Sequence, residues 1–322
     1  MAGNRRTFLK TAGFTAAALA AAPIGAAMPE VASAAGRAFS AGKFGLELDG
    51  AFQGFLVSTV GGEAFAEVIE VGALKHPGLP QYEDITVEFD FSMASSTFDW
   101  MKACMDGSPL RKSGALISAD FNFKELSRLD FSDALISEIG FPALDAASKD
   151  GGRLSLEFSP DSTRRKPGSG AAIPASAKVQ KKWFPANFRL KIDGLEAACT
   201  KVNKIEALVV KQKFLVNSDG GRQPGRLEYP NLVVTLAESA AGPFFDWAES
   251  FIIQGANGQK DEKSGSIDFL TLDLKTVLAT LTFSNLGIFR CAPEKAEAGV
   301  ESIRRVKAEM YCESMTFSMP AP

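Results

Sequence analysis

The sequence predicts a mainly β protein that contains two tandem copies of one domain, each with several strands and one helix. Three observations lead to this prediction. Apolar and polar residues alternate in short runs, the same short motifs recur in order later in the chain, and each copy contains one apolar run with helical spacing. The composition is that of a globular protein, since 46% of the 322 residues are hydrophobic and 23% are charged.

The first 34 residues predict a twin-arginine export signal. Two arginines precede an apolar pair, and an alanine-rich run up to Met28 is followed by a small-x-small cleavage pattern. The run is too short and too weakly apolar for a stable membrane span. We expect the mature chain to begin near Ala35 and to reside in the periplasm, on the cell surface or outside the cell. The signal residues are Arg5, Arg6, Phe8, Leu9, Lys10, Ala32 and Ala34.

The composition of the mature chain argues against several classes of function. Removal of residues 1–34 takes away three basic side chains and one acidic side chain, so the formal charge changes from −3 to −5. This balance gives no electrostatic reason to bind nucleic acid, and no second apolar run has membrane-spanning length. The only histidine is His76, and the four cysteines form no zinc, haem or CxxC pattern. We therefore expect no metal, no cofactor and no enzymatic activity; the sequence leaves the disulfide state open.

An internal repeat organises the mature chain. The segments Phe44–Gly50 and Phe188–Gly194 match at an offset of 144, and later motifs match at offsets that rise to 152. The offset drifts only across polar or glycine-rich stretches, where insertions cost little. The other matching motifs are Pro77-Gly78 with Pro224-Gly225, Phe98-Asp99-Trp100 with Phe245-Asp246-Trp247, Lys112-Ser113-Gly114 with Lys263-Ser264-Gly265, and Phe131-Ser132 with Phe283-Ser284.

Each copy is expected to contain strands around one helix. Alternation predicts strands over 44–48, 85–91, 154–158 and 306–310. In the first copy, Ser95-Ser96 is expected to cap a helix that stops at Asp106-Gly107. In the second copy, Gly242-Pro243 starts the helix and Gly255 ends it. The helix residues Phe98, Trp100, Phe245 and Trp247 are predicted to be core anchors, which we favour over a ligand-stacking role.

These patterns divide the chain into four parts. Residues 1–34 form the signal, residues 35–160 the first domain and residues 186–322 the second. The intervening residues 161–185 are rich in proline, glycine and serine and lack an apolar periodicity, so they are predicted to be a linker. The linker is basic, which leaves two hypotheses: a solvated connection or an arm that docks on an acidic surface.

The ordered motifs resemble the tail tube protein family of contractile phages and the related inner tubes of type VI secretion systems. The first copy has a Pro-Gly loop, a Tyr82-Glu83-Asp84 strand entry, a helix with Trp100, a Lys112-Ser113-Gly114 segment and Phe131-Ser132-Asp133-Ala134. The second copy departs from this pattern with Asn231 and with Asn285-Leu286.

The resemblance implies two β-sandwich or small-barrel domains, each with one flanking helix. It also implies that the protein forms a homo-oligomer, so that its partner is a second copy of itself. Such domains form six-membered rings that stack into a hollow tube, so three chains with two domains each would complete one ring. It also implies that the matching segments Lys112-Ser113-Gly114 and Lys263-Ser264-Gly265 are assembly hairpins. The export signal and the duplication depart from the family norm, which favours an exported cellular protein; a prophage origin stays open.

Two other classes of function remain as alternatives. An exported enzyme would need a nucleotide loop or a nucleophile motif, and the mature chain contains no GxGxxG, GxxxxGK[ST] or GxSxG string. Acidic residues around the Pro-Gly loop offer oxygen ligands of the kind that calcium prefers, but their alternation with apolar residues favours a solvated strand face. A monomeric binding module would have to protect its own strand edges, whereas a tube subunit leaves them available for pairing.

Overall fold

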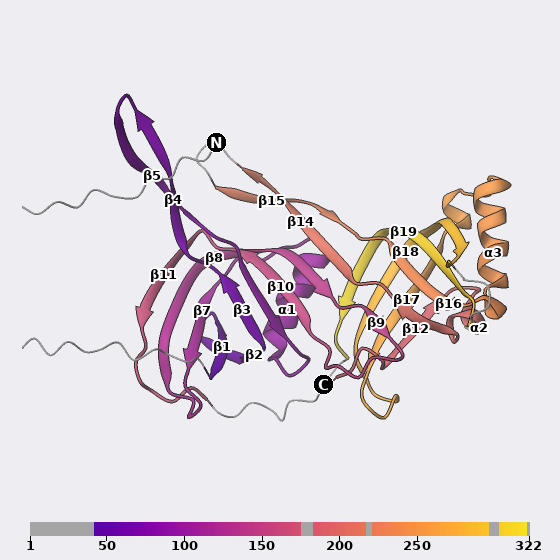
Figure 1. Ribbon diagram of the computed structural model, residues 1–322, viewed down its shortest axis with the longest axis horizontal. Helices are drawn as coiled ribbons and strands as arrows, with labels where there is room; N and C mark the ends of the chain where they lie inside the picture. Colours follow the sequence, from indigo (N-terminus) through magenta and orange to yellow (C-terminus); the bar gives the residue numbers. More distant parts are fainter. Residues whose placement is uncertain (1–41, 175–182, 217–220, 296–302, 321–322) are drawn as a thin grey trace, which may run out of the picture. The chain divides into compact units, whose positions relative to one another are not determined.

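The protein is described here by a computed structural model, which covers residues 42–174, 183–216, 221–295 and 303–320. These residues belong to one compact unit, Phe39–Pro322. The fold is mainly β with one principal helix in each half, which confirms the predicted fold class (Figure 1). The predicted signal residues and cleavage site lie outside the described residues.

The first half runs from residue 43 to residue 167. Its elements are β1 (Lys43–Leu48), β2 (Ala51–Leu56), β3 (Ser58–Gly61), β4 (Ala64–Val71), β5 (Leu74–Tyr82), β6 (Ile85–Phe89), α1 (Ser95–Met105), β7 (Lys112–Ala119), β8 (Glu125–Phe141), β9 (Leu144–Asp145), β10 (Leu154–Ser159) and β11 (Ser162–Pro167).

The second half begins at residue 188. Its elements are β12 (Phe188–Ile192), α2 (Glu196–Cys199), β13 (Val202–Ile205), β14 (Leu208–Val216), β15 (Arg222–Glu228), β16 (Leu232–Ala237), η1 (Glu238–Ala240), α3 (Gly242–Ala248), the π-helical turn η2 (Glu249–Ile253), η3 (Gln259–Asp261), β17 (Lys263–Leu270), β18 (Val277–Pro293) and β19 (Arg305–Ser318).

The two halves have the same strand order. Hydrogen-bonded neighbours follow β1-β7-β8-β10-β6-β3 in the first half and β12-β17-β18-β19-β16-β13 in the second. All of these pairs are antiparallel. The single strand β19 occupies the position that β10 and β11 share, because β10 and β11 both pair with β8. Each half also has one long hairpin, β4–β5 or β14–β15.

Irregularities recur at the same places in both halves. The β7–β8 register shifts between Lys112 and Gly114, and the β17–β18 register shifts between Lys263 and Gly265. Near these shifts, Asp133 and Asn285 have φ angles in the left-handed region, 49° and 54° respectively. Asp and Asn adopt this conformation more readily than most residues because their short polar side chains form local hydrogen bonds.

The helix capping prediction was wrong in detail. Helix α1 begins at Ser95, and Ala94 is its N-cap residue, with no side-chain capping bond. The Ser96 hydroxyl instead donates to Oε1 of Gln53. In the second half α3 begins at Gly242, and the helical path continues through η2 toward Gly255, whose φ of 74° ends it.

The segment predicted as a linker is structured where it is described. Residues Ser162–Pro167 form β11, which pairs along β8 from Ser132 to Ser127. Further along, Ile173 is buried, and Trp183 is only 1% exposed. The apolar residues of this segment are widely spaced and show no period, so its strand is not visible in the sequence pattern. Two of the basic residues in this segment form ion pairs, Arg165 with Glu63 and Lys166 with Asp130.

One apolar core runs through both halves, and a cluster of aromatic rings lies within it. The Phe141 ring lies 5.8 Å from the rings of both Phe269 and Phe317, measured between centroids. Trp183 contacts Phe269 at 5.4 Å and Phe91 at 5.3 Å. Because these rings come from β8, β17, β19 and the connecting segment, the core joins the two halves.

Candidate assembly surfaces

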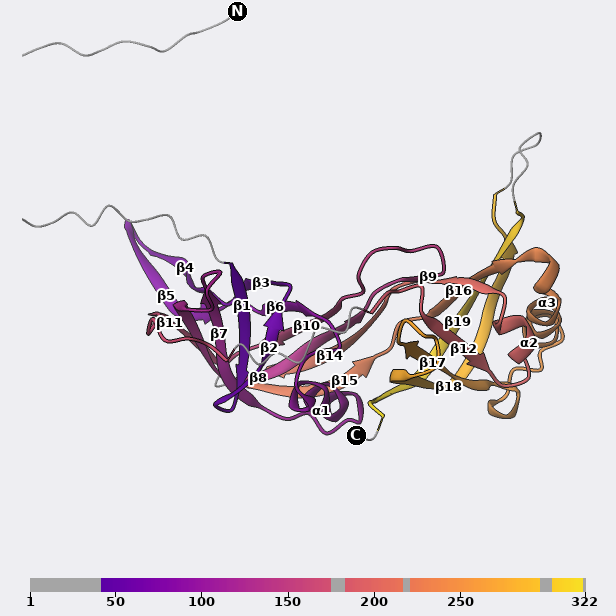
Figure 2. The same ribbon diagram turned by 90° about the horizontal axis from the view of Figure 1, so that it is seen from below.

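The hairpin β14–β15 of the second half pairs with the sheet of the first half. Residues Leu208–Lys211 of β14 lie antiparallel to Glu138–Phe141 of β8 (Figure 2). Leu208 and Val210 are buried there together with Ile139. The Lys211 ammonium forms an ion pair with the Glu138 carboxylate. We call this contact the internal junction, and through it β14 and β15 of the second half join the sheet of the first half.

The matching hairpin of the first half, β4–β5, pairs with no other described strand. It extends away from the neighbouring strands (Figure 1). Several large apolar side chains on it are exposed, and an isolated two-stranded hairpin is marginally stable in water. These side chains are Phe65, Val68, Ile69, Val71, Leu74 and Leu79. The exposed apolar surface and unpaired edges make β4–β5 a candidate assembly surface.

The predicted assembly segments lie on the first strands of the antiparallel hairpins β7–β8 and β17–β18, at the ends away from the connecting loops. Lys112-Ser113-Gly114 begins β7, which lies between β1 and β8, and Lys263-Ser264-Gly265 begins β17, which lies between β12 and β18. A Cβ atom at Gly114 would lie 1.9 Å from the Glu47 carbonyl oxygen, and one at Gly265 would lie 2.1 Å from that of Lys191. The two motifs therefore match because two neighbouring strands approach closely at each glycine. Lys112 pairs with Asp49, and Lys263 donates to the Asp193 carbonyl oxygen.

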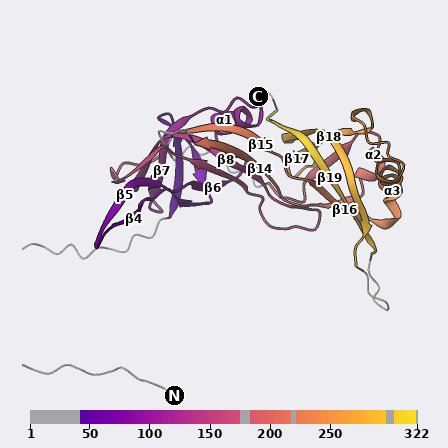
Figure 3. The ribbon, with the colours of Figure 1, turned by 90° about the horizontal axis from the view of Figure 1, so that it is seen from above.

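Three of the four predicted core anchors are buried. Phe98, Trp100 and Trp247 are core residues, and the Trp100 indole donates to the Leu110 carbonyl oxygen at 2.8 Å. Phe245 is only half-buried, and its neighbour Phe244 is fully buried instead. The first buried residue of α3 is thus Phe244 and not the predicted Phe245. Helix α3 packs on β18 (Figure 3).

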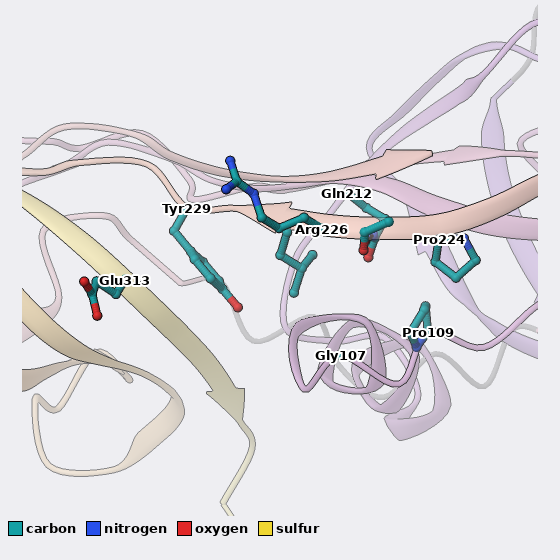
Figure 4. A pocket seen from close by; sticks show the side chains of 9 residues that line it. Gly107, Pro109, Gln212, Pro224, Arg226, Tyr229 and Glu313 are labelled. Carbon is teal, nitrogen blue, oxygen red and sulfur yellow. Dashed lines mark hydrogen bonds between the residues drawn. The ribbon is translucent and has the colours of Figure 1, made fainter. Parts of the chain in front are cut away.

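A pocket lies beside the internal junction, between the end of α1, the hairpin β14–β15 and β19. The polar side chains of Gln212, Arg226, Tyr229 and Glu313 line it together with Pro109 and Pro224 (Figure 4). Burial raises the pKa of the Tyr229 hydroxyl. Residues of both halves line the pocket, so we attribute it to the packing of the two halves at the internal junction.

The single histidine and the acidic residues near it lie on the exposed β4–β5 hairpin and its surroundings. His76 lies in β5, is exposed, and is the strand partner of Ile69 in β4. Within the described ranges, no three His, Cys, Asp or Glu side chains gather in an arrangement able to hold a metal ion. In the same ranges no helix is long and apolar enough to cross a membrane.

The four cysteines all lie within the described residues and are unpaired. Burial raises the pKa of Cys104 to about 12 and that of Cys291 to about 11. A raised pKa disfavours the thiolate, which is the nucleophilic form. The buried thiols of Cys104, Cys199 and Cys312 therefore lie in unreactive environments, whereas Cys291 is partly exposed.

Comparisons with known proteins give the following relations. No protein-family model matches the sequence, and no curated protein matches it. A chain of the anti-feeding prophage tube-terminating cap is 15% identical, with 46% of the present chain and 99% of that chain covered and a TM-score of 0.34. A chain of the anti-feeding prophage baseplate is 14% identical, with coverages of 41% and 91% and a TM-score of 0.32.

A third similar structure is Hcp1 from Flavobacterium johnsoniae. It is 14% identical, with 41% of the present chain and 94% of that chain covered and a TM-score of 0.26. All three TM-scores lie below 0.5, and the fold is defined by the strand pairings of this chain itself.

Proposed function

We propose that this protein is an exported structural subunit that assembles with copies of itself. Its two halves act as two tail-tube-like domains, which derive from a tandem duplication. Three chains then form a ring with pseudo-sixfold symmetry, and rings stack into a hollow tube. In this proposal the partner is the protein itself, and its role needs no cofactor, nucleic acid or catalytic group.

One observation supports the proposal above all others. The two halves share a strand order and are joined by the pairing of one hairpin with the other half, while the equivalent hairpin β4–β5 is left unpaired. A contact that joins unlike surfaces head to tail can be repeated from chain to chain and closes into a ring when the rotation permits. Unpaired strand edges are a liability in a monomer but a template for association in an assembly.

Negative-stain electron microscopy of residues 35–322 over a range of concentrations tests the proposal. This fragment includes the compact unit Phe39–Pro322. We expect rings with three chains in each layer, or tubes built from such rings. Particles of one-chain mass at every concentration would contradict the proposal and would favour a monomeric binding module.

The export route has a separate test. The twin-arginine pathway is proposed from Arg5 and Arg6, so replacing both with lysine is expected to retain the protein in the cytoplasm. Fractionation followed by immunoblotting measures the distribution. The Lys10→Arg variant keeps the arginine pair and is the matched control. Undiminished export of the double lysine variant would contradict the assignment.

A further inference from the structure

The internal junction shows how one half of this protein contacts another half. In it, β14 extends the sheet at the part of β8 that lies beyond the end of β7, since β7 pairs with β8 only up to Ala134. The same contact includes α1, which packs on β19 of the second half. The Phe98 ring of α1 lies 6.3 Å from the ring of Phe317. One half thus contributes a strand edge and a helix, and the other contributes a hairpin and a strand.

The unpaired hairpin β4–β5 is built like the hairpin that forms the internal junction. In β14–β15 the register shifts after the pair Gln212 and Leu227, and in β4–β5 it shifts after Ala66 and Pro80. After the shift, the second strand of each hairpin has a Pro-Gly pair. Gly225 lies against the backbone of Lys213, and Gly78 lies against that of Glu67. Aligning the two hairpins on this feature places Phe65 at the position of Lys211 and Ala64 at that of Val210.

The second half has an unoccupied counterpart of the strand edge on β8. Strand β18 continues beyond β17 from Gly287 to Pro293, and there it pairs only with β19 among the described strands. It skips one residue after Ile288, just as β8 skips one residue after Ile136. Arg290 and Cys291 therefore correspond to Glu138 and Ile139. We call Arg290–Pro293 the β18 ledge.

Burial differs between the residues of the internal junction and their counterparts in β4, the β18 ledge and η2. Ile139 and Val210 are fully buried in the internal junction, whereas Cys291 is partly exposed and Ala64 is exposed. The helices differ in the same way. Met105 of α1 is 2% exposed, but Ile252, its counterpart in η2, is 48% exposed. The hairpin, the ledge and the helix therefore all lack the cover that their counterparts have.

The charges at the internal junction also differ from those at the β18 ledge. In the internal junction Glu157, Glu138 and Lys211 lie in one row across three strands, and Lys211 neutralises part of the acidic charge. In the second half, Glu309 and Arg290 already form an ion pair at 3.0 Å. A strand that paired with β18 at this point would need no charge opposite Arg290, and Phe65, which is 46% exposed, carries an aromatic ring of the kind that lies against a guanidinium.

We propose that the β4–β5 hairpin of one copy pairs antiparallel with the β18 ledge of a second copy. This proposal rests on the proposed self-assembly and names the surfaces that carry it. Residues Glu63–Phe65 lie opposite Arg290–Ala292, so that Ala64 faces Cys291 of the neighbouring copy. The exposed face of α3 and η2 packs against the half that supplies the hairpin, as α1 does within the chain.

A cysteine cross-link between chains tests this pairing directly. The Ala64→Cys variant of residues 35–322 places a thiol opposite the native Cys291 at a separation typical of neighbouring strands, which a disulfide can span. After mild copper-phenanthroline oxidation we expect dimers and higher multiples of the chain on a non-reducing gel. The matched controls are Leu74→Cys, at the hairpin tip, and Ala64→Cys combined with Cys291→Ser. Both are expected to lose at least nine-tenths of the cross-linked product.

The outcomes separate this inference from the proposed function. Rings or tubes in the microscope without an Ala64→Cys cross-link would overturn the pairing while leaving self-assembly intact. Cross-linked chains that never close into rings would support the pairing and contradict the ring. Equal cross-linking by Leu74→Cys would show unspecific collision and would overturn the pairing as well.

A substitution that leaves the fold intact provides a second test. Phe65→Lys places a lysine opposite Arg290, and like charges directly across a strand pair are destabilising. We expect analytical ultracentrifugation to show at least a tenfold weaker association. Leu74→Lys changes the charge equally at an exposed site away from the ledge and should leave the association constant within twofold. Unchanged association of Phe65→Lys would overturn the pairing.

Discussion

The close approach at Gly114 and Gly265 makes a quantitative prediction about stability. A Cβ atom at residue 265 would lie 2.1 Å from the Lys191 carbonyl oxygen and 2.7 Å from Cε2 of Phe283. The strand β12 would have to move by about 1 Å to restore an ordinary contact, and overpacking of this kind typically costs about 1–3 kcal/mol. Gly265→Ala and Gly114→Ala should each lower the free energy of unfolding by this amount.

Urea denaturation followed by tryptophan fluorescence measures the effect. The control is Gly151→Ala, because a Cβ atom there meets nothing within 4 Å and the change should stay within about 0.5 kcal/mol. Because the two glycines lie in different halves, the double variant should lose about the sum of the two single losses. If both single variants are as stable as the control, then the motif is not explained by the approach of the strands, and an assembly role regains its support.

Four further predictions concern the core and the Cys104 thiol. Trp183→Ala should cost about 3–5 kcal/mol of unfolding free energy, because its ring is buried against Phe91 and Phe269; a loss below 1 kcal/mol would contradict its place in the core. Asp268→Ala should cost about 1–3 kcal/mol in urea denaturation, since the carboxylate accepts from Arg189 at 2.7 Å and Thr280 at 2.9 Å; an unchanged midpoint would contradict this. Burial raises the pKa of Cys104 to about 12, so a thiol reagent at pH 8 should label it only after unfolding, and rapid native labelling would refute this. The same raised pKa contributes stability that is present below about pH 9 and lost as the pH rises toward 12.

Local patterns in the sequence were sufficient to predict most of the strands. Alternating residues in Phe44–Leu48, Leu154–Phe158 and Val306–Met310 fall in β1, β10 and β19. A period of two reports one buried and one exposed face, which is a local property of a strand. The same logic found the buried Trp100 and Trp247 from their helical spacing.

Contacts between distant strands were not predictable in this way. The pairing of Ser162–Pro167 with β8 could not be predicted, because three basic residues mask the alternation of this strand. The sequence also suggested an assembly role for Lys112-Ser113-Gly114, since a repeated motif looks the same whether it serves packing or association. Only the position of Gly114 next to the Glu47 carbonyl oxygen reveals the packing constraint.

The differences between the two hairpins explain how two similar contacts can avoid exchanging partners. If β14 paired with the β18 ledge, Lys211 would lie opposite Arg290, and like charges across a strand pair are destabilising. If β4 paired with β8, Phe65 would replace Lys211 and leave Glu138 and Glu157 side by side without a counter-charge. Each wrong pairing therefore carries an electrostatic penalty that the correct pairing lacks. Under the proposed pairing, the differences between the two halves fix a strict alternation of first and second halves along the assembly, which identical halves would not enforce.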